Sequence, residues 1–540
     1  MLMWWPLACG GSDGTRPVPT DSSTETGETS SPTGDTATTT LPDELRIVDG
    51  PTVGDPADNR LRLVRMLTVS TNAPTQARLV LDDGERQRSI TFPDLATTHE
   101  LPVLGLLQNT DYDATVTLTD AAGASVSAEV AIATAALPEL LPTFEVLADL
   151  PTAEPGLRMF PVGSDRAPFM VTAVDHTGQI VWALVTQQDT KALSWEPETA
   201  RFGYLLNSDR IHRATTWGTE DEGWSPDGAA GTIRVLVPGF HHEAAFEADG
   251  SFWTFHQSVA EVPEFPISEL TPTVLRPATI KSDTVIHVAP DGTVLGRWPL
   301  HEIFPTSRIG YDSLEDWTHA NAIVPLPDED AFLVSMRHQD TVARVRQSTS
   351  AVEWVLANHD GWPSEWADRL LEPVGSPFAW QYHQHAPFLA SDGSLFLFDN
   401  GNNGRTTPYS RDPLPIPLTS RLVQYRVDPV AMTVEQGFSQ AFGDPALWSK
   451  ALGNADVLPI SGHVFGTFAY LYREEGVDNL DAGLGARTVR LIEVDPATGV
   501  TQWDVRVKGA VQDVPTGYQI DRAIVIPSLY PSGVVEEWLP

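Results

Sequence analysis

A short β-hairpin signal recurs along most of this 540-residue chain, and it constrains the fold more than any other feature. Each copy is a turn followed by a short apolar strand that often ends in tryptophan. The copies lie at 177–182, 249–253, 291–298, 351–354, 392–396 and 498–503. The flanking residues are β-branched or aromatic, and no long segment with helical periodicity interrupts the hairpins. Hairpins that repeat from about residue 150 to residue 535 predict a β-propeller of about six blades with four strands each.

Residues 44–137 have a different pattern, with short runs of alternating apolar and polar residues such as 61–66 and 112–118. Turn residues separate these runs, for example Asp-Asp-Gly at 82–84. Their number and spacing predict a sandwich of about seven strands, of immunoglobulin or fibronectin III type. No group of titratable residues in it looks catalytic, so we interpret it as a spacer or docking module. The whole chain is therefore predicted to be all-β, with a small sandwich before a propeller at 150–535.

The first residues have the pattern of a signal sequence. An apolar run ends in Leu7-Ala8-Cys9, small residues follow at once, and this resembles a bacterial lipoprotein signal at 1–9 in which Cys9 becomes the lipidated residue. Residues 10–43 are mostly Ser, Thr, Gly, Asp, Glu and Pro, a composition that predicts a disordered tether. We therefore expect an exported protein, lipid-anchored on the periplasmic or cell-surface face of a bacterial membrane. An ordinary disordered terminus is the alternative.

Composition excludes several partners. The chain has 72 acidic and 34 basic residues, giving a formal net charge of −38 at pH 7. A surface this negative repels phosphate backbones and anionic lipid heads, so nucleic acid is not an expected partner. The single cysteine excludes an intramolecular disulfide. No later apolar segment approaches the length of a spanning helix, so membrane contact is expected through the lipid anchor alone.

Three histidines and one asparagine share a position in their hairpins. His242 and His385 each lie seven residues before the Asp of an Asp-Gly turn, and Asn454 lies seven residues before a Ser-Gly pair. His319 begins a similar segment with a slightly longer strand. The innermost strand of each propeller blade runs along the central channel, so equivalent positions on successive blades converge there. The register therefore predicts that these four residues surround one axial pocket.

The residues near this pocket favour an anion over a metal ion. Histidines can bind metal, move protons or act as nucleophiles. Arg337 follows His319 by eighteen residues and is expected on the next strand of the same blade. A fixed cation lowers the affinity of a metal site but suits an oxyanion of sulfate or phosphate type, so no metal is predicted. Trp317, Phe240, Tyr382 and Trp380 lie close to the histidines in sequence, either as walls for an aromatic ligand or as blade core.

The order of several motifs resembles the arylsulfotransferase family. The sequence Trp-Thr-His-Ala-Asn at 317–321, followed by Ser-Met-Arg at 335–337, is similar to the family's central signature. His-His-Glu at 241–243 resembles its His-His-Asp segment, and Gln-His-Ala at 384–386 resembles the blade that carries its nucleophile. The closing stretch 518–523 is also similar. The resemblance covers most of the predicted propeller, and the preceding small β domain agrees with the family's layout.

This resemblance implies a function and a role for each motif residue. The family transfers a sulfuryl group from a phenolic sulfate to another phenol without a nucleotide donor. By resemblance, His385 would be the nucleophile that becomes a transient sulfohistidine. His242, His319 and Arg337 would line the oxyanion pocket, with Asn321 assisting. Either His242 or His319 would protonate the leaving phenolate.

The remaining expectations concern ligands and alternatives. We expect small-molecule aryl sulfate and phenol substrates, no cofactor, and substrate contacts from Asn454 and Trp317; a homodimer is left open. His383 is an alternative nucleophile, but His385 keeps the seven-residue register. A non-catalytic ligand-binding propeller and a metal-dependent hydrolase are the alternative functions, because fold alone does not decide function.

Overall fold

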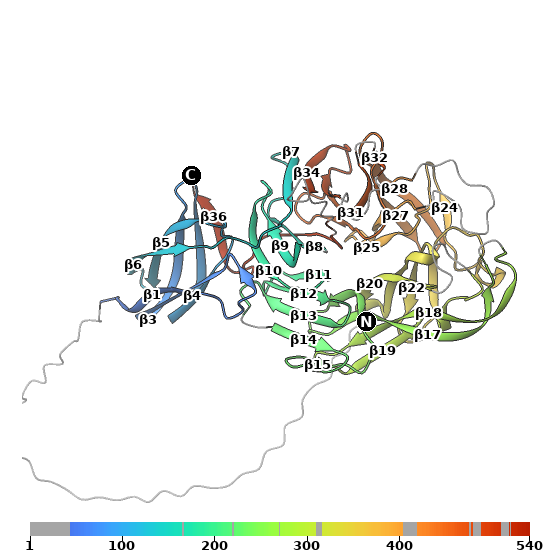
Figure 1. Cartoon of the computed structure of the whole chain (residues 1–540), viewed down its shortest axis with the longest axis horizontal. Coiled ribbons are helices and arrows are strands. Elements are labelled where there is room, and N and C mark those ends of the chain that lie inside the picture. The colour runs from blue at the N-terminus through green and yellow to red at the C-terminus, as the bar shows by residue number, and fades with distance from the viewer. Residues whose placement is uncertain are drawn as a thin grey trace, which may run out of the picture. The chain divides into compact units, whose positions relative to one another are not determined.

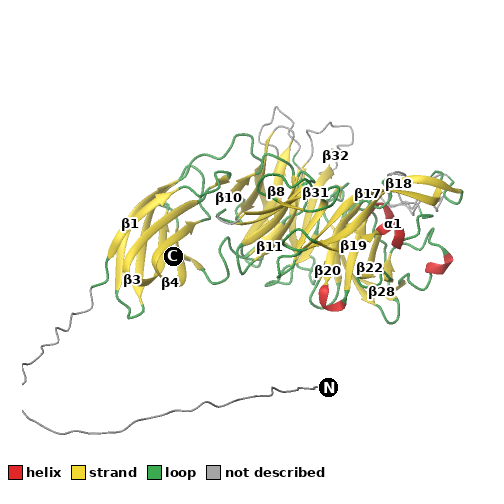
Figure 2. Cartoon of the chain, turned by 90° about the horizontal axis from the view of Figure 1, so that it is seen from below, coloured by secondary structure: helices red, strands yellow, loops and turns green. Residues whose placement is uncertain are grey.

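The computed structural model describes residues 44–164, 167–218, 221–268, 271–308, 316–402, 418–474, 477–478, 488–508, 518 and 520–539. Among these residues the regular structure is almost entirely β-strand (Figure 2). The one α-helix in this part of the chain, α1 (Leu300–Ile303), has four residues, and three 3-10 helices have three residues each. No helix in the described ranges has the length and hydropathy needed to cross a membrane. Cys9 and the predicted tether at 10–43 lie outside the described residues.

Six sheets surround a common centre and form the blades of a propeller (Figure 1). Blade 1 contains β35 (Ile524–Ile526), β8 (Leu157–Ser164), β9 (Ala167–Val174), β10 (Ile180–Val185) and β2 (Leu61–Arg62). Blade 2 contains β11 (Thr190–Glu196), β12 (Arg201–Leu206), β13 (Arg210–Thr215), β14 (Asp221–Ser225) and β15 (Ile233–Arg234). Blade 3 contains β16 (His241–Phe246), β17 (Phe252–Pro266), β18 (Leu275–Val288) and β19 (Val294–Pro299).

The other three blades follow in chain order. Blade 4 contains β20 (Ala320–Leu326), β21 (Ala331–Met336), β22 (Thr341–Arg346) and β23 (Val352–Leu356). Blade 5 contains β25 (His385–Leu389), β26 (Leu395–Asp399), β27 (Arg421–Asp428), β28 (Thr433–Ala441) and β24 (Glu372–Val374). Blade 6 contains β29 (Trp448–Ser449), β30 (Ala455–Val457), β31 (Val464–Glu474), β32 (Val477–Asp478), β33 (Thr488–Val494), β34 (Thr501–Lys508) and β7 (Thr143–Asp149).

The ring closes through strands from both ends of the propeller segment. The inner strands β11, β16, β20, β25 and β30 are neighbours in that order, and β11 also adjoins β8 and β35 of blade 1. β35, which follows blade 6 in the chain, pairs with β8 of blade 1, while β7, which precedes blade 1, pairs with β34 of blade 6. A buried ion pair between Arg158 and Glu493, at 3.0 Å, links the same two blades. The predicted six-bladed propeller is confirmed.

The recurring tryptophans connect neighbouring blades. The indole N–H of Trp182 in blade 1 donates to the carbonyl of Thr216 in blade 2 at 2.7 Å. Trp503 in blade 6 donates to the carbonyl of His176 in blade 1 at 2.9 Å. Both rings are fully buried, so each tryptophan fills the space between blades and also satisfies a backbone acceptor there.

One further sheet lies outside the six blades. It contains β1 (Ile47–Gly54), β3 (Arg65–Asp82), β4 (Gln87–Val103), β5 (Asp111–Asp120), β6 (Ser125–Ala133) and the C-terminal strand β36 (Val535–Leu539). β3 pairs with β1 along its first half and with β5 along its second half, with a register shift between Ser70 and Thr75. β3 also pairs with β4 along nearly its whole length, so β3 and β4 join the strands of both halves. The sheet forms a half-barrel. The predicted immunoglobulin or fibronectin III sandwich is not confirmed.

Candidate active site

The predicted register residues lie at the inner edges of four consecutive blades. His242 is in β16, His319 directly precedes β20, His385 begins β25 and Asn454 directly precedes β30. His242 and His319 have left-handed backbones, with φ of 58° and 43°. The pairing register of the inner strand shifts next to His242, His319 and His385. Such bulges re-aim side chains, and strained residues of this kind gather at functional sites.

His242 and His319 meet in the channel, with ring centroids 5.0 Å apart. The Nδ1 atoms of His242 and His241 are 2.9 Å apart, and Nε2 of His241 lies 3.0 Å from Oδ1 of the buried Asp283. Burial, followed by the charges of neighbouring groups that include His319 and His385, holds the pKa of His242 well below its usual value. The His242 ring is therefore neutral at neutral pH.

His319 has a carboxylate partner on its other side. Its Nδ1 lies 2.6 Å from Oδ2 of Asp316, and its ring stacks on that of His338 with centroids 4.5 Å apart. Burial would raise the pKa of Asp316, but the hydrogen bond and charge of His319 and the charge of His338 outweigh it and hold that pKa low. Burial and the charges of His319 and Arg337 lower the pKa of His338 to about 4. His319 is thereby oriented by an ionised carboxylate.

His385 has a defined tautomer. Its Nδ1 lies 2.6 Å from Oδ1 of Asn400 and 3.2 Å from the carbonyl of His383, and both oxygens can only accept. The backbone N–H of Leu452 points at Nε2 over 3.3 Å. The proton therefore resides on Nδ1, and Nε2 carries the free electron pair. Burial and the charge of Arg337 hold the pKa of His385 well below its usual value, which keeps the ring neutral.

Arg337 lies among the histidines. It follows β21 in a short 3-10 turn, is 6% exposed, and donates to the carbonyl of Lys450 at 3.4 Å. After burial, its positive charge contributes to the lowered pKa values of His338, His383 and His385. A buried cation surrounded by neutral imidazoles is suited to an anion with several oxygens.

The other predicted contacts have different surroundings. Asn321 donates to the carbonyl of Gln384 at 2.8 Å, and among the described residues its buried Oδ1 has no hydrogen-bond partner. The amide of Asn454 bonds to the backbone of Ala523 and to Asp456, which makes it a link in the ring closure. Trp317 is 1% exposed in the core, and its indole N–H donates to the carbonyl of Arg308 at 2.8 Å. The interpretation of Trp317 as blade core fits these contacts better than a substrate wall does.

A cavity of about 320 Å³ opens beside His242 and His319. Its lining comes from blades 2, 3 and 4 and comprises Ser208, Pro238, Gly239, Phe240, His241, His242, Gln257, Asp283, Asp316 and His319. This volume is within the range of small-molecule sites. Phe240 is the one of the four predicted aromatic residues that lines it.

Comparison with known proteins identifies the family. The family model described as Arylsulfotransferase (ASST) matches residues 152–519.

The chain belongs to the arylsulfotransferase family.

Two similar proteins are members of the same family and match part of this chain. Arylsulfate sulfotransferase AssT of Escherichia coli O6:H1 is 33% identical over 144 residues, and AssT of Lelliottia amnigena is 34% identical over 143 residues. Each match covers 24% of this chain and 23% of the relative, so the chain matches about a quarter of the length of these relatives.

The periplasmic gluconolactonase PpgL of Pseudomonas aeruginosa has a TM-score of 0.30 and 12% identity, covering 72% of this chain and 99% of its own. The β-propeller domain of Cps50 (Swd1) from Myceliophteria thermophila has a TM-score of 0.29 and 10% identity, covering 70% and 98%.

Several groups at this site have no role in the sequence prediction. Asp316 and His338 form the second layer behind His319. Arg522 forms an ion pair with Glu243 at 3.2 Å and donates to the carbonyls of His242 and Asn321 at 3.4 Å. Arg522 and Glu243 lie in two of the segments that resemble the family's motifs. Their opposite charges were the only sequence signal that could have predicted this ion pair.

Three of these residues could also hold a metal ion. Asp316, His319 and His338 each offer one ligand atom, and these atoms lie within 4.8 Å of one another. Arg337 lowers the pKa of the adjacent His338 by its charge, and the same charge repels a cation. The donor set fits a divalent ion, but the positive charge of Arg337 favours an anion, and the absence of a metal stays a prediction.

Proposed function

We propose that this arylsulfotransferase transfers a sulfuryl group from an aryl sulfate to a phenol through a transient sulfohistidine at His385. The observation that carries the proposal is the state of His385. It is buried, neutral and fixed by Asn400 in the tautomer that leaves Nε2 unprotonated, with its electron pair turned towards the backbone N–H of Leu452. A neutral imidazole nitrogen is a competent nucleophile, whereas an imidazolium is not.

The surrounding cation and donors suit the transition state of such a transfer. As the Nε2–S bond forms and the S–O bond breaks, negative charge spreads over the three equatorial oxygens of the sulfuryl group. Arg337 supplies a permanent positive charge beside the ring, and His242 and His319 meet within 5.0 Å of each other on the adjoining blades. We assign these three side chains to the equatorial oxygens, where preorganised donors lower the barrier.

The direct test seeks the covalent intermediate. The enzyme is mixed with a chromogenic aryl sulfate, quenched rapidly at alkaline pH and digested for mass spectrometry. We expect one sulfuryl group on the peptide that contains His385, and no transfer by His385→Ala. A modified His383 with full activity in His385→Ala would contradict the assignment.

We also propose that the protein is exported and held on a bacterial membrane through lipidated Cys9. The apolar run before Cys9 and the small residues after it support this proposal. The wild type should partition into detergent and incorporate a labelled fatty acid, and Cys9→Ser should do neither. An unlabelled, fully soluble wild type would refute lipidation.

A further inference from the structure

In two blades the channel histidine lies at the same number of residues before the hairpin turn. In blade 3 the turn after the inner strand begins at Glu247, whose carbonyl accepts the N–H three residues later. In blade 5 the corresponding turn begins at Ala390. His242 and His385 each precede the first residue of this turn by five positions. In blades 3 and 5 the channel histidine therefore lies at the same distance from the turn that follows it.

Blade 2 has a turn with the same backbone hydrogen bond, and five residues before it lies Lys191. The carbonyl of Glu196 accepts the N–H of Thr199, and Lys191 lies five residues before Glu196. As at His385, the residue after Lys191 has a left-handed backbone, with φ of 56° at Ala192, and the strand register shifts at that point. Lys191 is therefore the blade 2 counterpart of His385.

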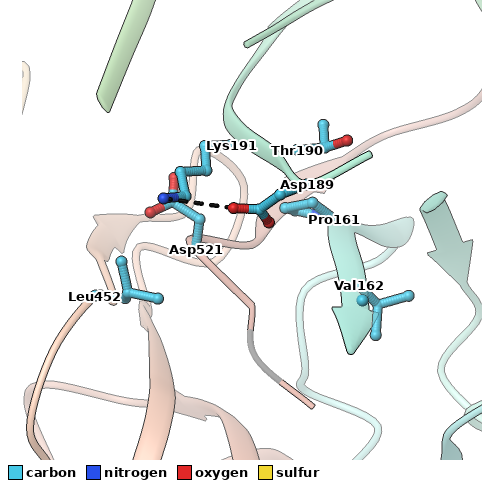
Figure 3. A pocket seen from close by; sticks show the side chains of 8 residues that line it. Pro161, Val162, Asp189, Thr190, Lys191, Leu452 and Asp521 are labelled. Atoms are coloured by element: carbon cyan, nitrogen blue, oxygen red, sulfur yellow. Dashed lines mark ion pairs between the residues drawn. The ribbon is translucent and has the colours of Figure 1, made fainter. Parts of the chain in front are cut away.

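The contacts of Lys191 place it near the reacting groups. Its ammonium lies 3.5 Å from Oδ2 of Asp189, and both side chains line a small pocket that also contains Leu452 and Asp521 (Figure 3). Leu452 is the residue whose N–H points at Nε2 of His385. The charge of Lys191 also contributes to the low pKa of His242. The positive charge of Lys191 therefore acts on the site. Its ion pair with Asp189 is weak, because the Asp189 side chain is 34% exposed and water screens the attraction.

The position of blade 2 in the ring gives this ammonium a specific relation to His385. In a closed ring of six blades, blade 2 and blade 5 are three apart and face each other across the channel. In an in-line displacement the leaving oxygen is on the side of sulfur opposite the nucleophile. Nε2 of His385 in blade 5 is directed at the N–H of Leu452, and Leu452 lines the same small pocket as Lys191. A phenolic oxygen in line with Nε2 would therefore depart towards Lys191 in blade 2, while Arg337 and His319 come from blade 4.

We propose that Lys191 is a further catalytic residue, whose ammonium holds the departing phenolic oxygen and later the oxygen of the acceptor. This inference rests on the proposed function. As the Nε2–S bond forms, the S–O bond breaks and its electron pair stays on the phenolic oxygen. One ammonium proton passes to that oxygen, which gives a phenol and a neutral amine. The acceptor phenol returns a proton to the amine as its oxygen attacks sulfur and the N–S bond breaks, which regenerates Lys191 and His385.

The test compares leaving groups in Lys191→Met. Single-turnover release of the phenol is measured with 4-nitrophenyl sulfate, whose phenolate is stable, and with 4-methoxyphenyl sulfate, whose phenolate is not. We expect the variant to slow the nitrophenyl substrate by less than about threefold and the methoxyphenyl substrate by on the order of 10²-fold, the effect of one lost donor. An equal factor for both substrates, or no change, overturns the proposal.

Three further variants separate this role from a structural one. Lys191→Arg keeps the charge, but a guanidinium does not give up its proton, so this variant should recover only a small part of the methoxyphenyl rate. Asp189→Asn releases the ammonium without removing it and should keep the wild-type ratio of the two substrates. Lys508→Met is the matched control, since Lys508 pairs with Glu145 on the outer edge of blade 6 and should not affect either substrate.

Failure of this inference is distinguishable from failure of the proposed function. If the wild type forms no sulfohistidine at His385, the proposed function is wrong. If the wild type forms it and Lys191→Met keeps the wild-type ratio of the two substrates, only the role of Lys191 is wrong. Thermal unfolding of each variant verifies that the fold is intact, so that a loss of rate reports on the reaction.

Discussion

Replacing Asn400 with aspartate should raise the pKa of His385, the proposed nucleophile. Oδ1 of Asn400 accepts the Nδ1 proton of His385 at 2.6 Å. Aspartate has the same size and keeps an acceptor at that position, but it adds a negative charge. The charge stabilises the imidazolium form of His385, whose pKa in the native site is held well below the usual value by burial and Arg337.

The size and sign of the effect follow from this contact. An opposite charge within hydrogen-bond distance raises the pKa of the imidazole by about 1 to 3 units. His385 must be neutral to attack sulfur, so the acid limb of the rate profile should move to higher pH by the same amount. Below the new pKa the rate of phenol release should fall about tenfold for each pH unit, and alkaline pH should restore it.

The assay is the pH profile of the first turnover, measured by rapid mixing with 4-nitrophenyl sulfate. Asn402→Asp is the matched control. Asn402 bonds to the same loop of blade 6, donating to the carbonyl of Lys450 at 2.6 Å and accepting from Trp448 at 3.0 Å, rather than to His385. Asn400→Asp should move the acid limb and Asn402→Asp should not. An unmoved limb in Asn400→Asp, or equal shifts in both variants, would refute the reasoning.

Three other outcomes are expected. Arg337→Ala should lower the single-turnover rate by on the order of 10²-fold, and Arg337→Lys should recover only part of it, because lysine keeps the charge and loses the planar fork; full recovery would argue against bidentate binding. Protein treated with a chelator should keep its full transfer rate, because Arg337 disfavours a cation at the Asp316, His319 and His338 group; activity that is lost and then restored by zinc would contradict this. Trp182→Phe should lower the free energy of unfolding in urea by about 1 to 3 kcal/mol, because it leaves the carbonyl of Thr216 without its donor; an unchanged midpoint would show that this bond is not needed.

The local repeats were sufficient to predict the propeller, but not the strands that complete it. Hairpin signals such as Asp249-Gly250 and Asp392-Gly393 encode a turn and its flanking strands within a few residues. β2 and β7 instead pair with strands far away in the sequence, and β36 returns to the first sheet. A strand of two to seven residues whose partner is distant has no local periodicity that separates it from a loop.

The site was predictable to a similar extent. Register alone indicated that His242, His319 and His385 share the channel, because equivalent positions on successive blades converge. Asp316, His338 and Asn400 were missed, because each acts through a single side-chain contact that only the folded chain creates. Lys191 was missed for a different reason: its turn at 196–199 has no glycine, and no predicted hairpin fell in blade 2.

The propeller places chemically different groups around one reacting centre by repeating a single backbone feature. Each of the inner strands β11, β16, β20 and β25 has a register shift beside its channel residue, although the residues there are a lysine and three histidines. In the proposed reaction, opposite blades supply the two ends of an in-line displacement, and the blades between them supply groups that flank it. If this arrangement guides the reaction, changes in blades 3 and 4 should slow all aryl sulfates by a similar factor, since the equatorial oxygens are common to all of them. Changes in blade 2 should discriminate between leaving groups, since only the departing oxygen differs.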